Sequence, residues 1–269
     1  MPADLFDQTK SALLALGSHR VWSLMVTLFG DLAQAEGSTI DGPTLSAVMT
    51  EMDIRPEAVR VALHRLRNDG WISSQKTGRT GQHCLTPLGR SETRQASARI
   101  YASATSPHEG WKLVLTQDAD TPQHLTTQGL LPLLPRIYLG GTQAKVPPMA
   151  LVLTGNDAPE WLRSQIAPLM LEADYAALLP ALGQVEQMMQ IDMLTPLQTA
   201  TLRCLLVHNW RRIVLRHPPL PHALLPENWS GHACHLLIET LLTRFPRPAI
   251  NTILPARVSR TSPPLPRPL

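Results

Sequence analysis

The chain has 269 residues, of which 43% are hydrophobic and 17% charged, so it suits one large domain or two to three small ones with a buried core. Its apolar runs all fall short of the ~18 residues of a membrane span, and its start lacks the pattern of a secretory leader. Three scattered cysteines without a CxxC pair fit a reduced protein. We therefore expect a cytoplasmic protein without a membrane partner.

The net charge of +3 conceals an uneven distribution. Residues 55–100 hold nine Lys and Arg against three Asp and Glu, a balance of +6, whereas residues 1–54 and 101–200 each carry −5. A basic block between acidic neighbours is typical of a surface that binds a polyanion such as nucleic acid. The alternative is an ordinary charged helix face in water.

The first hundred residues predict three helices and a hairpin. Apolar residues recur at helical spacing over residues 18–37, 41–53 and 55–69. A proline in the first turn of the third helix and Gly70 after its last turn are typical helix boundaries. Two strand-like pieces, "WISSQK" and "QHCLTP", are joined by "TGRTG", and another helix begins at Pro87. This order predicts a winged helix-turn-helix, with the hairpin as the wing beside the third helix.

The third helix divides into two faces. One side carries the apolar residues Ala58, Val59, Ala62, Leu63 and Leu66. The other side is polar and includes Glu57, and the wing adds basic residues beside Gly78 and Gly81. Such donors suit phosphate oxygens and base edges in a major groove. The candidate DNA-binding residues are Arg55, Arg60, His64, Arg65, Arg67, Asn68, Lys76 and Arg79.

The rest of the chain predicts a mixed segment followed by helices. Buried strands are expected over residues 111–116, 136–141 and 149–155, and a helix at "PEWLRSQIAPLM". Thr195 caps a long helix that starts with proline, and "HACHLLIETLLTRF" forms a final helix. Residues 246–269 hold seven prolines, four arginines and no acid, which favours an extended tail.

Several of these segments resemble a known family. They are "SLMVTLFGD", "VRVALHRLRNDGW", "TGRTGQHCLTPLGR", "RIY" followed by "GWKLVL", and "LLVHNWRRIVLRHPPLPHALLPENWSG". Between about Arg20 and Leu242 the chain is similar to the PaaX family of bacterial repressors of phenylacetate degradation. Asn209 and His217 stand where that family usually carries Glu and Asp, which either tunes an effector site toward a different anion or is neutral change.

The resemblance implies a DNA-binding transcriptional regulator that is a homodimer and leaves its double-stranded operator when phenylacetyl-CoA or a related acyl-CoA binds. It implies Arg60 and Arg65 as recognition-helix arginines and Arg79 as the wing arginine. With the residue patterns, it predicts an α+β multidomain fold. The expected domains are a winged-helix domain at 1–100, a ferredoxin-like α+β domain at 101–175, a helical effector and dimerisation domain at 176–245, and a Pro/Arg-rich tail at 246–269.

An acyl-CoA effector needs cations and an apolar slot. The candidate effector residues are Arg203, Trp210, Arg211, Arg212, Arg216 and Trp229. The alternative is that Trp210 belongs to the core and the arginines form surface pairs or a dimer interface.

Enzyme and metal signatures are weak. Cys204 with His208, and the later group His232, Cys234 and His235, match no compact zinc signature, so we expect neither a metal nor a cofactor. The sequence carries no nucleophile elbow, phosphate loop or paired carboxylates, which argues against an enzyme. Two alternatives stay open. One is a metal-dependent nuclease using Asp118 and Asp120, and the other is a protein-interaction module using the tail.

Overall fold

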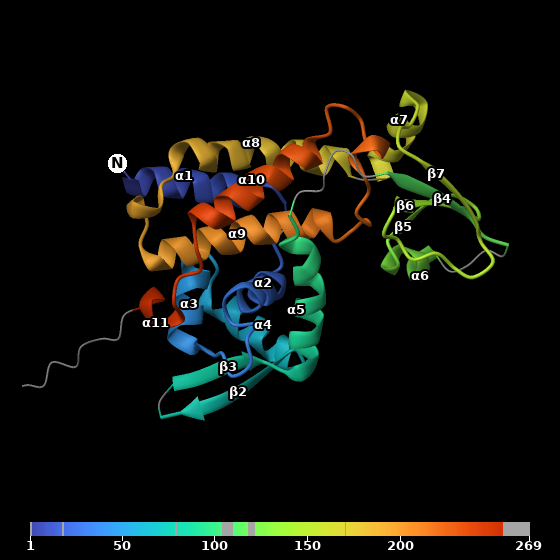
Figure 1. Ribbon diagram of the computed structural model, residues 1–269. Helices are drawn as coiled ribbons and strands as arrows, with labels where there is room; N and C mark the ends of the chain where they lie inside the picture. The colour runs from blue at the N-terminus through green and yellow to red at the C-terminus, as the bar shows by residue number, and fades with distance from the viewer. Residues whose placement is uncertain are drawn as a thin grey trace, which may run out of the picture.

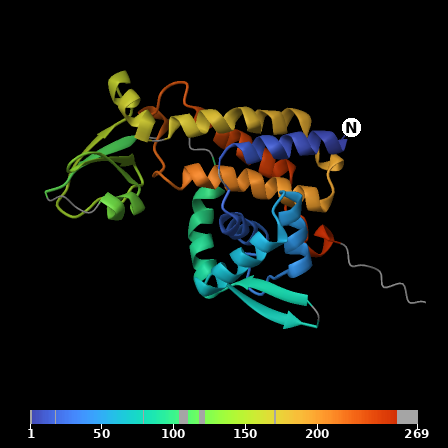
Figure 2. The same cartoon turned by 180° about the vertical axis from the view of Figure 1, so that it is seen from behind.

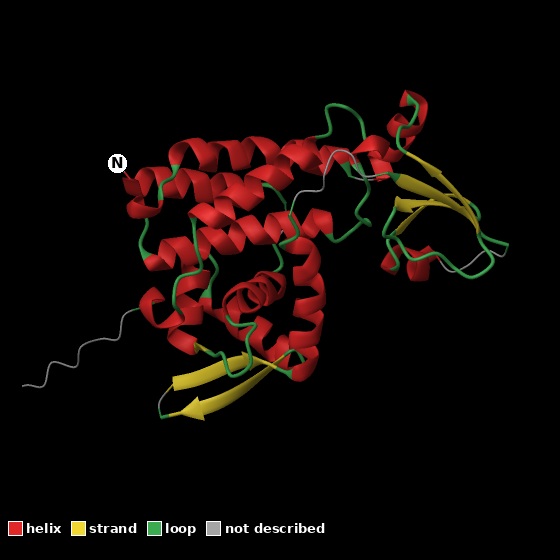
Figure 3. Cartoon of the chain, viewed as in Figure 1, coloured by secondary structure: helices red, strands yellow, loops and turns green. Residues whose placement is uncertain are grey.

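The computed structural model describes residues 2–17, 19–78, 80–103, 110–117, 122–169 and 171–254. The fold is α+β: helices dominate, and two small antiparallel sheets lie at separate places (Figure 3). One sheet lies at the edge of the helical body, and the other forms a lobe to its side (Figure 1). Within the described residues no single helix is long and apolar enough to cross a membrane, although the bent pair Glu160–Ala167 and Glu172–Met188 meets that test jointly by length and composition.

The basic segment lies in a unit of four helices and a hairpin, in the expected order. Its elements are α2 (Val21–Leu32), β1 (Ile40–Asp41), α3 (Gly42–Glu51), α4 (Pro56–Asn68), β2 (Ile72–Thr77), β3 (Thr80–Leu85) and α5 (Pro87–Ile100). The carboxylate of Asp41 caps α3 by accepting from the Thr44 amide at 2.7 Å. Gly70, with φ of 72°, follows α4. The strands pair in the order β1-β3-β2.

The N-terminal helix α1 (Pro2–Ala15) was not expected from the sequence, and it does not pack as part of this unit. It lies along α8 and α9 in the C-terminal helical layer (Figures 1 and 2). The Asn209 amide donates to the Leu13 carbonyl at 3.1 Å, and Arg212 donates to that of Leu16 at 2.7 Å. The expected domain at 1–100 therefore divides in space, since its first helix belongs to the C-terminal helices.

The lateral lobe contains β4 (Trp111–Leu115), α6 (Pro122–Thr127), β5 (Leu130–Leu134), β6 (Ile137–Gly141), β7 (Leu151–Gly155) and α7 (Glu160–Leu169). The sheet order is β5-β6-β4-β7, all antiparallel. This is the strand order of a ferredoxin-like sheet, but residues 142–150 contain no helix and α7 follows the last strand. The sequence prediction omitted β5, and it was wrong about burial of β7, an edge strand whose four leading residues are exposed.

The C-terminal part consists of α8 (Glu172–Met188), η1 (Ile191–Met193), α9 (Pro196–Val214), η2 (His222–Leu224), α10 (Ser230–Arg244) and α11 (Ile250–Ile253). Thr195 and Gln198 form the capping box that starts α9. Helix α9 is buried along most of its length because it lies between the α1/α8/α10 layer and the basic unit (Figures 1 and 2). The extended tail was expected to start at residue 246, but helix α11 lies within its first residues. Residues 255–269 are outside the described part of the chain.

Candidate nucleic-acid interface

Helix α4 is held by its apolar face. Val59, Ala62 and Leu66 are buried at 3%, 5% and 1% exposure, and the helix packs on α2, α3 and β2. Burying a Val or Leu side chain contributes about 1.5–3 kcal/mol, so the rotation of the helix is fixed by these contacts. The opposite face is consequently directed to solvent.

That exposed side carries the predicted residues of this helix. Arg55, Arg60, His64, Arg65, Arg67 and Asn68 are all exposed. Lys76 is exposed on β2 of the hairpin, and Arg79 lies outside the described residues. The structure therefore brings six of the predicted residues onto one helix surface and leaves Lys76 on the neighbouring hairpin.

Most of the polar side chains on α4 have neighbours on the same helix. Arg60 pairs with Glu57 at 2.8 Å, and Arg65 pairs with Asp69 at 3.4 Å. Arg65 also lies over the Trp22 ring, 5.1 Å from its centroid. Exposed pairs of this kind contribute only about 0–1 kcal/mol. They can be exchanged for phosphate or base contacts at little cost.

The hairpin is shaped for close approach but contains a buried imidazole. Gly78 has φ of 61°, a conformation that favours glycine, and a side chain there would meet no atom within 4 Å. On β3, the ring of His83 contacts the Ser74 hydroxyl at 2.7 Å. Burial and the charge of Arg67 lower the pKa of His83. His83 is thus a neutral structural residue of the hairpin near neutral pH.

The predicted effector arginines on and just after α9 do not converge on one cavity. Arg211 donates to the Thr27 hydroxyl at 2.9 Å, and Arg212 reaches α1. Arg216 makes an exposed pair with Asp174 at 3.0 Å. Each of these three arginines contacts a different element, which agrees with the alternative interpretation of arginine pairs better than with an effector wall.

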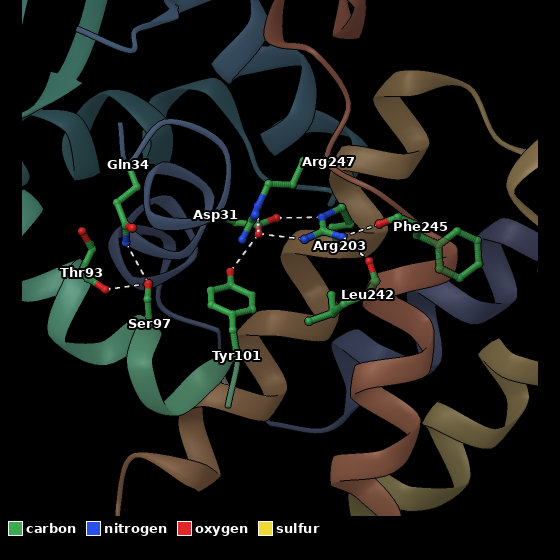
Figure 4. Close-up of polar contacts among 9 residues, drawn as sticks. All are labelled: Asp31, Gln34, Thr93, Ser97, Tyr101, Arg203, Leu242, Phe245 and Arg247. Carbon is green, nitrogen blue, oxygen red and sulfur yellow. Dashed lines mark hydrogen bonds and ion pairs between the residues drawn. The ribbon is translucent and has the colours of Figure 1, made fainter. Parts of the chain in front are cut away.

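Arg203 belongs to a buried ionic network that the sequence prediction missed (Figure 4). Asp31, on α2, accepts two bonds from Arg203 at 2.9 Å, one from Tyr101 at 2.8 Å and one from Arg247 at 2.9 Å. Arg203 also donates to the carbonyls of Leu242 and Phe245. A single Asp in the apolar run "LMVTLFGDLA" was the available signal, because a buried charge requires partners.

This Asp31 network joins the basic unit to the C-terminal helices. Burial by itself raises the pKa of Asp31, but the bonds and charges of Arg203 and Arg247 outweigh it, so the pKa lies below its ordinary value. A second link nearby is the bond from Gln34, just beyond α2, to Ser97 of α5 at 2.8 Å (Figure 4). The orientation of α2 is therefore tied to both α5 and α9.

Trp210 and Trp229 meet around a different feature, a cavity of about 310 Å³ that we call the aromatic cavity. The Tyr175 ring lies 5.9 Å from that of Trp210 and 5.2 Å from that of Trp229, between centroids. His217 donates from Nδ1 to the Pro218 carbonyl at 2.9 Å, so its Nε2 accepts from the Tyr175 hydroxyl at 2.7 Å. Burial lowers the pKa of His217 to about 4, which keeps the ring neutral.

The end of α5 forms one side of this cavity. Arg99 lines it and donates to the carbonyls of Val214 and His217, and the Trp210 indole donates to the Ile100 carbonyl at 3.0 Å. Because Tyr101 follows directly and binds Asp31, the cavity wall and the Asp31 network lie on consecutive residues. This adjacency could not be read from sequence.

The weak metal-binding candidates on α9, Cys204 and His208, have other contacts. The Cys204 thiol donates to the Leu24 carbonyl at 3.6 Å, and the His208 ring contacts the Thr27 hydroxyl at 3.2 Å. Burial lowers the pKa of His208 to about 3, with the charge of Arg211 contributing. Among the residues that the structure describes, no group of three or more His, Cys, Asp or Glu side chains is arranged to hold a metal ion.

An exposed basic helix beside a hairpin is a feature of DNA-binding transcriptional regulators, and the sequence comparisons point to the same class. The family models for PaaX-like protein and for PaaX-like protein C-terminal domain match residues 20–87 and 169–253. The chain belongs to the PaaX-like family.

A curated relative agrees with this assignment, and a solved structure shares the fold. The chain is 28% identical over 251 residues to the transcriptional repressor PaaX of Escherichia coli (strain K12), covering 82% of this chain and 79% of that protein. Its fold is similar to that of the uncharacterized protein Rv0674 from Mycobacterium tuberculosis, with a TM-score of 0.53 and 17% identity. That similarity covers 86% of this chain and 97% of the other.

Proposed function

We propose that this protein is a winged-helix repressor of a phenylacetate-type catabolic operon, with α4 inserted into the major groove and the β2–β3 hairpin as its wing. The observation that carries the proposal is the exposed basic side of α4, held outward by a buried apolar face. Repression and the phenylacetate pathway rest on the similarity to the E. coli repressor. Half-sites for a dimer would be about 34 Å apart, one turn of the duplex.

Fluorescence anisotropy with duplex DNA from the region upstream of the protein's own gene tests this proposal. Each phosphate contact that is removed reduces the slope of log K against log salt by about 0.9. We expect the triple variant Arg55→Ala, Arg60→Ala and Arg67→Ala to bind DNA more weakly. Its slope of log K against log salt should fall by the amount that corresponds to two to three phosphate contacts. Arg216→Ala is the matched control, because Arg216 makes a comparably exposed ion pair away from α4. Unchanged affinity and slope in the triple variant would refute the α4 assignment.

We propose further that the protein is a homodimer that pairs through β7. This edge strand exposes Leu151 at 58% and Leu153 at 55%, and Trp161 of α7 is 67% exposed. An exposed apolar edge favours pairing with another strand, and a second copy offers the same edge in antiparallel orientation. Leu153→Lys is expected to give monomers in analytical ultracentrifugation. Leu134→Lys, at the opposite edge on β5, is the control and is expected to remain dimeric.

The aromatic cavity supports the proposal of an aryl-acyl-CoA effector. Its rings and its volume of about 310 Å³ suit an aromatic acyl group. A neighbouring cleft of about 570 Å³ lies between α5 and the lateral lobe and shares Arg99, Pro219 and Leu220 with it. Its walls include the polar side chains of Glu92, Gln95 and Gln128, which could contact a longer, polar part of the ligand. A ligand that displaces Arg99 would disturb the end of α5, next to the Asp31 network.

Calorimetry with phenylacetyl-CoA tests the effector proposal. We expect binding to the wild type, loss of DNA affinity on saturation, and at least tenfold weaker effector binding by Trp229→Ala. Trp161→Ala, which alters an exposed tryptophan outside the cavity, is the control. Absence of heat together with unchanged DNA affinity would reject this effector.

The two alternative functions have less support. Asp118 and Asp120 lie outside the described residues, as does the tail from residue 255. The similarity to a transcriptional repressor favours the regulator over a nuclease. Incubation of duplex DNA with the protein and magnesium, followed by electrophoresis, tests for cleavage, and partner capture with and without residues 255–269 tests the interaction module.

A further inference from the structure

We propose that Val61 determines DNA sequence specificity by packing its isopropyl group against the 5-methyl group of a thymine in the major groove. The inference rests on the proposed function, because it requires α4 to enter that groove. It adds an apolar base contact to the basic DNA-binding residues considered so far. It also commits to one kind of partner, a T·A base pair in each half-site.

The position of Val61 carries the inference. Its side chain is 70% exposed, the most exposed large apolar side chain on the elements α2–α5. It follows Arg60 directly and lies one helical turn from Glu57, on the side of α4 that also holds His64. The buried stripe that anchors α4 lies on the other side, so Val61 takes no part in holding the helix.

The fold gives no reason for a valine at this position. Branching at Cβ restricts its rotamers in a helix, and at an exposed helix position Ala, Lys, Arg or Glu is favoured by up to about 0.7 kcal/mol. An exposed isopropyl group also gains nothing from water. A contact that forms only when another molecule covers this face would explain the residue.

The surrounding side chains restrict what that contact can be. Glu57 and Arg60 are bonded to each other at 2.8 Å, and Asn68 Nδ2 contacts His64 Nδ1 at 3.3 Å. These polar groups can bind phosphates or the donors and acceptors of base edges, whereas Val61 can offer only apolar contact. In the major groove the thymine 5-methyl group is the apolar feature that distinguishes one base pair from another. The chemistry of Val61 therefore selects thymine.

The experiment removes the methyl group from the DNA and the isopropyl group from the protein. Duplexes that bind the wild type are first selected from a randomised library. Each thymine of a selected half-site is then replaced in turn by deoxyuridine, and dissociation constants are measured for the wild type and for Val61→Ala. Alanine favours helix, so the variant is expected to fold, which circular dichroism checks. Leu88→Ala, an exposed apolar residue at the start of α5, is the matched control.

We expect one thymine per half-site at which deoxyuridine weakens wild-type binding about four-fold, the value of one buried methyl-sized group. Val61→Ala should bind the thymine duplex about four-fold more weakly than the wild type does. Its affinity should not fall further when that thymine is replaced by deoxyuridine, whereas Leu88→Ala should behave as wild type. Additive losses, or no thymine whose methyl group matters, would show that Val61 is only a tolerated surface residue. Failure to enrich any sequence would instead overturn the proposed function, and the inference with it.

Discussion

Replacing Asp31 by Asn is the sharpest test of how the basic unit is attached. The side chains of Asp31 and Arg203 are 1% and 3% exposed, so the substitution leaves the Arg203 guanidinium buried without its counter-charge. Breaking a buried pair of this kind costs about 3–5 kcal/mol. The smaller contributions can be separated. Tyr101→Phe removes one hydrogen bond to a charged group, about 1.5–3 kcal/mol, and the half-exposed Arg247 contributes about 1 kcal/mol or less.

The assay is denaturant unfolding followed by tryptophan fluorescence. Asp53→Asn is the matched control, because Asp53 is 70% exposed in its pair with Lys10 and should cost less than about 1 kcal/mol. The pKa of Asp31 is depressed in the fold, so its contribution is present above the ordinary pKa of 3.8 and is lost as the pH falls through the lower folded value. The difference between wild type and Asp31→Asn should therefore be large at pH 7 and shrink near pH 3. Equal losses for the Asp31 and Asp53 variants would refute the reasoning.

Three further outcomes are expected. Burial lowers the pKa values of His208 and His217 to about 3 and about 4, so the unfolded chain binds more protons below pH 6.5 and stability should fall as the pH decreases from 6.5 toward 4. Thermal unfolding across that range measures this, and His217→Gln should flatten the slope. Thr195→Ala removes the capping box of α9 and should cost about 1 kcal/mol in denaturant unfolding, whereas no change would contradict the cap. Gly89→Ala places a Cβ 2.2 Å from the Trp71 carbonyl oxygen and should cost about 1–3 kcal/mol or shift the start of α5, with a lower melting temperature as the readout.

Helix periodicity predicted the basic unit well because its signals are local. Pro56 and Gly70 mark α4 to within a residue or two, and the alternation of apolar and basic positions gave the buried and exposed faces. The lateral lobe was harder. Strand β5 contains Pro132, and β7 begins with three apolar residues although it is an exposed edge, so composition could not indicate burial.

The effector residues show the limit of helical spacing. The prediction of a single effector wall assumed that these arginines face the same side of the helix. Arg203 and Arg211 instead bind Asp31 and Thr27 of α2, whereas Arg212 binds the Leu16 carbonyl at the end of α1. The partners of a central helix lie far away in sequence: Asp31 is 172 residues from Arg203. Two aromatic residues, Trp210 and Trp229, do meet, but around Tyr175 and Arg99, which no sequence pattern had singled out.

The sequence by itself determined the order of helices and hairpin, the outward basic side of α4 and the family, because these depend on neighbours a few residues apart and on short characteristic segments. Only the tertiary structure decided that α1 packs with the C-terminal helices, that Asp31 joins four segments and that a cavity opens beside the end of α5. Those features arise where the burial of α9 forces distant polar groups to find partners, since an unpaired charge in the interior costs far more than the contacts that satisfy it.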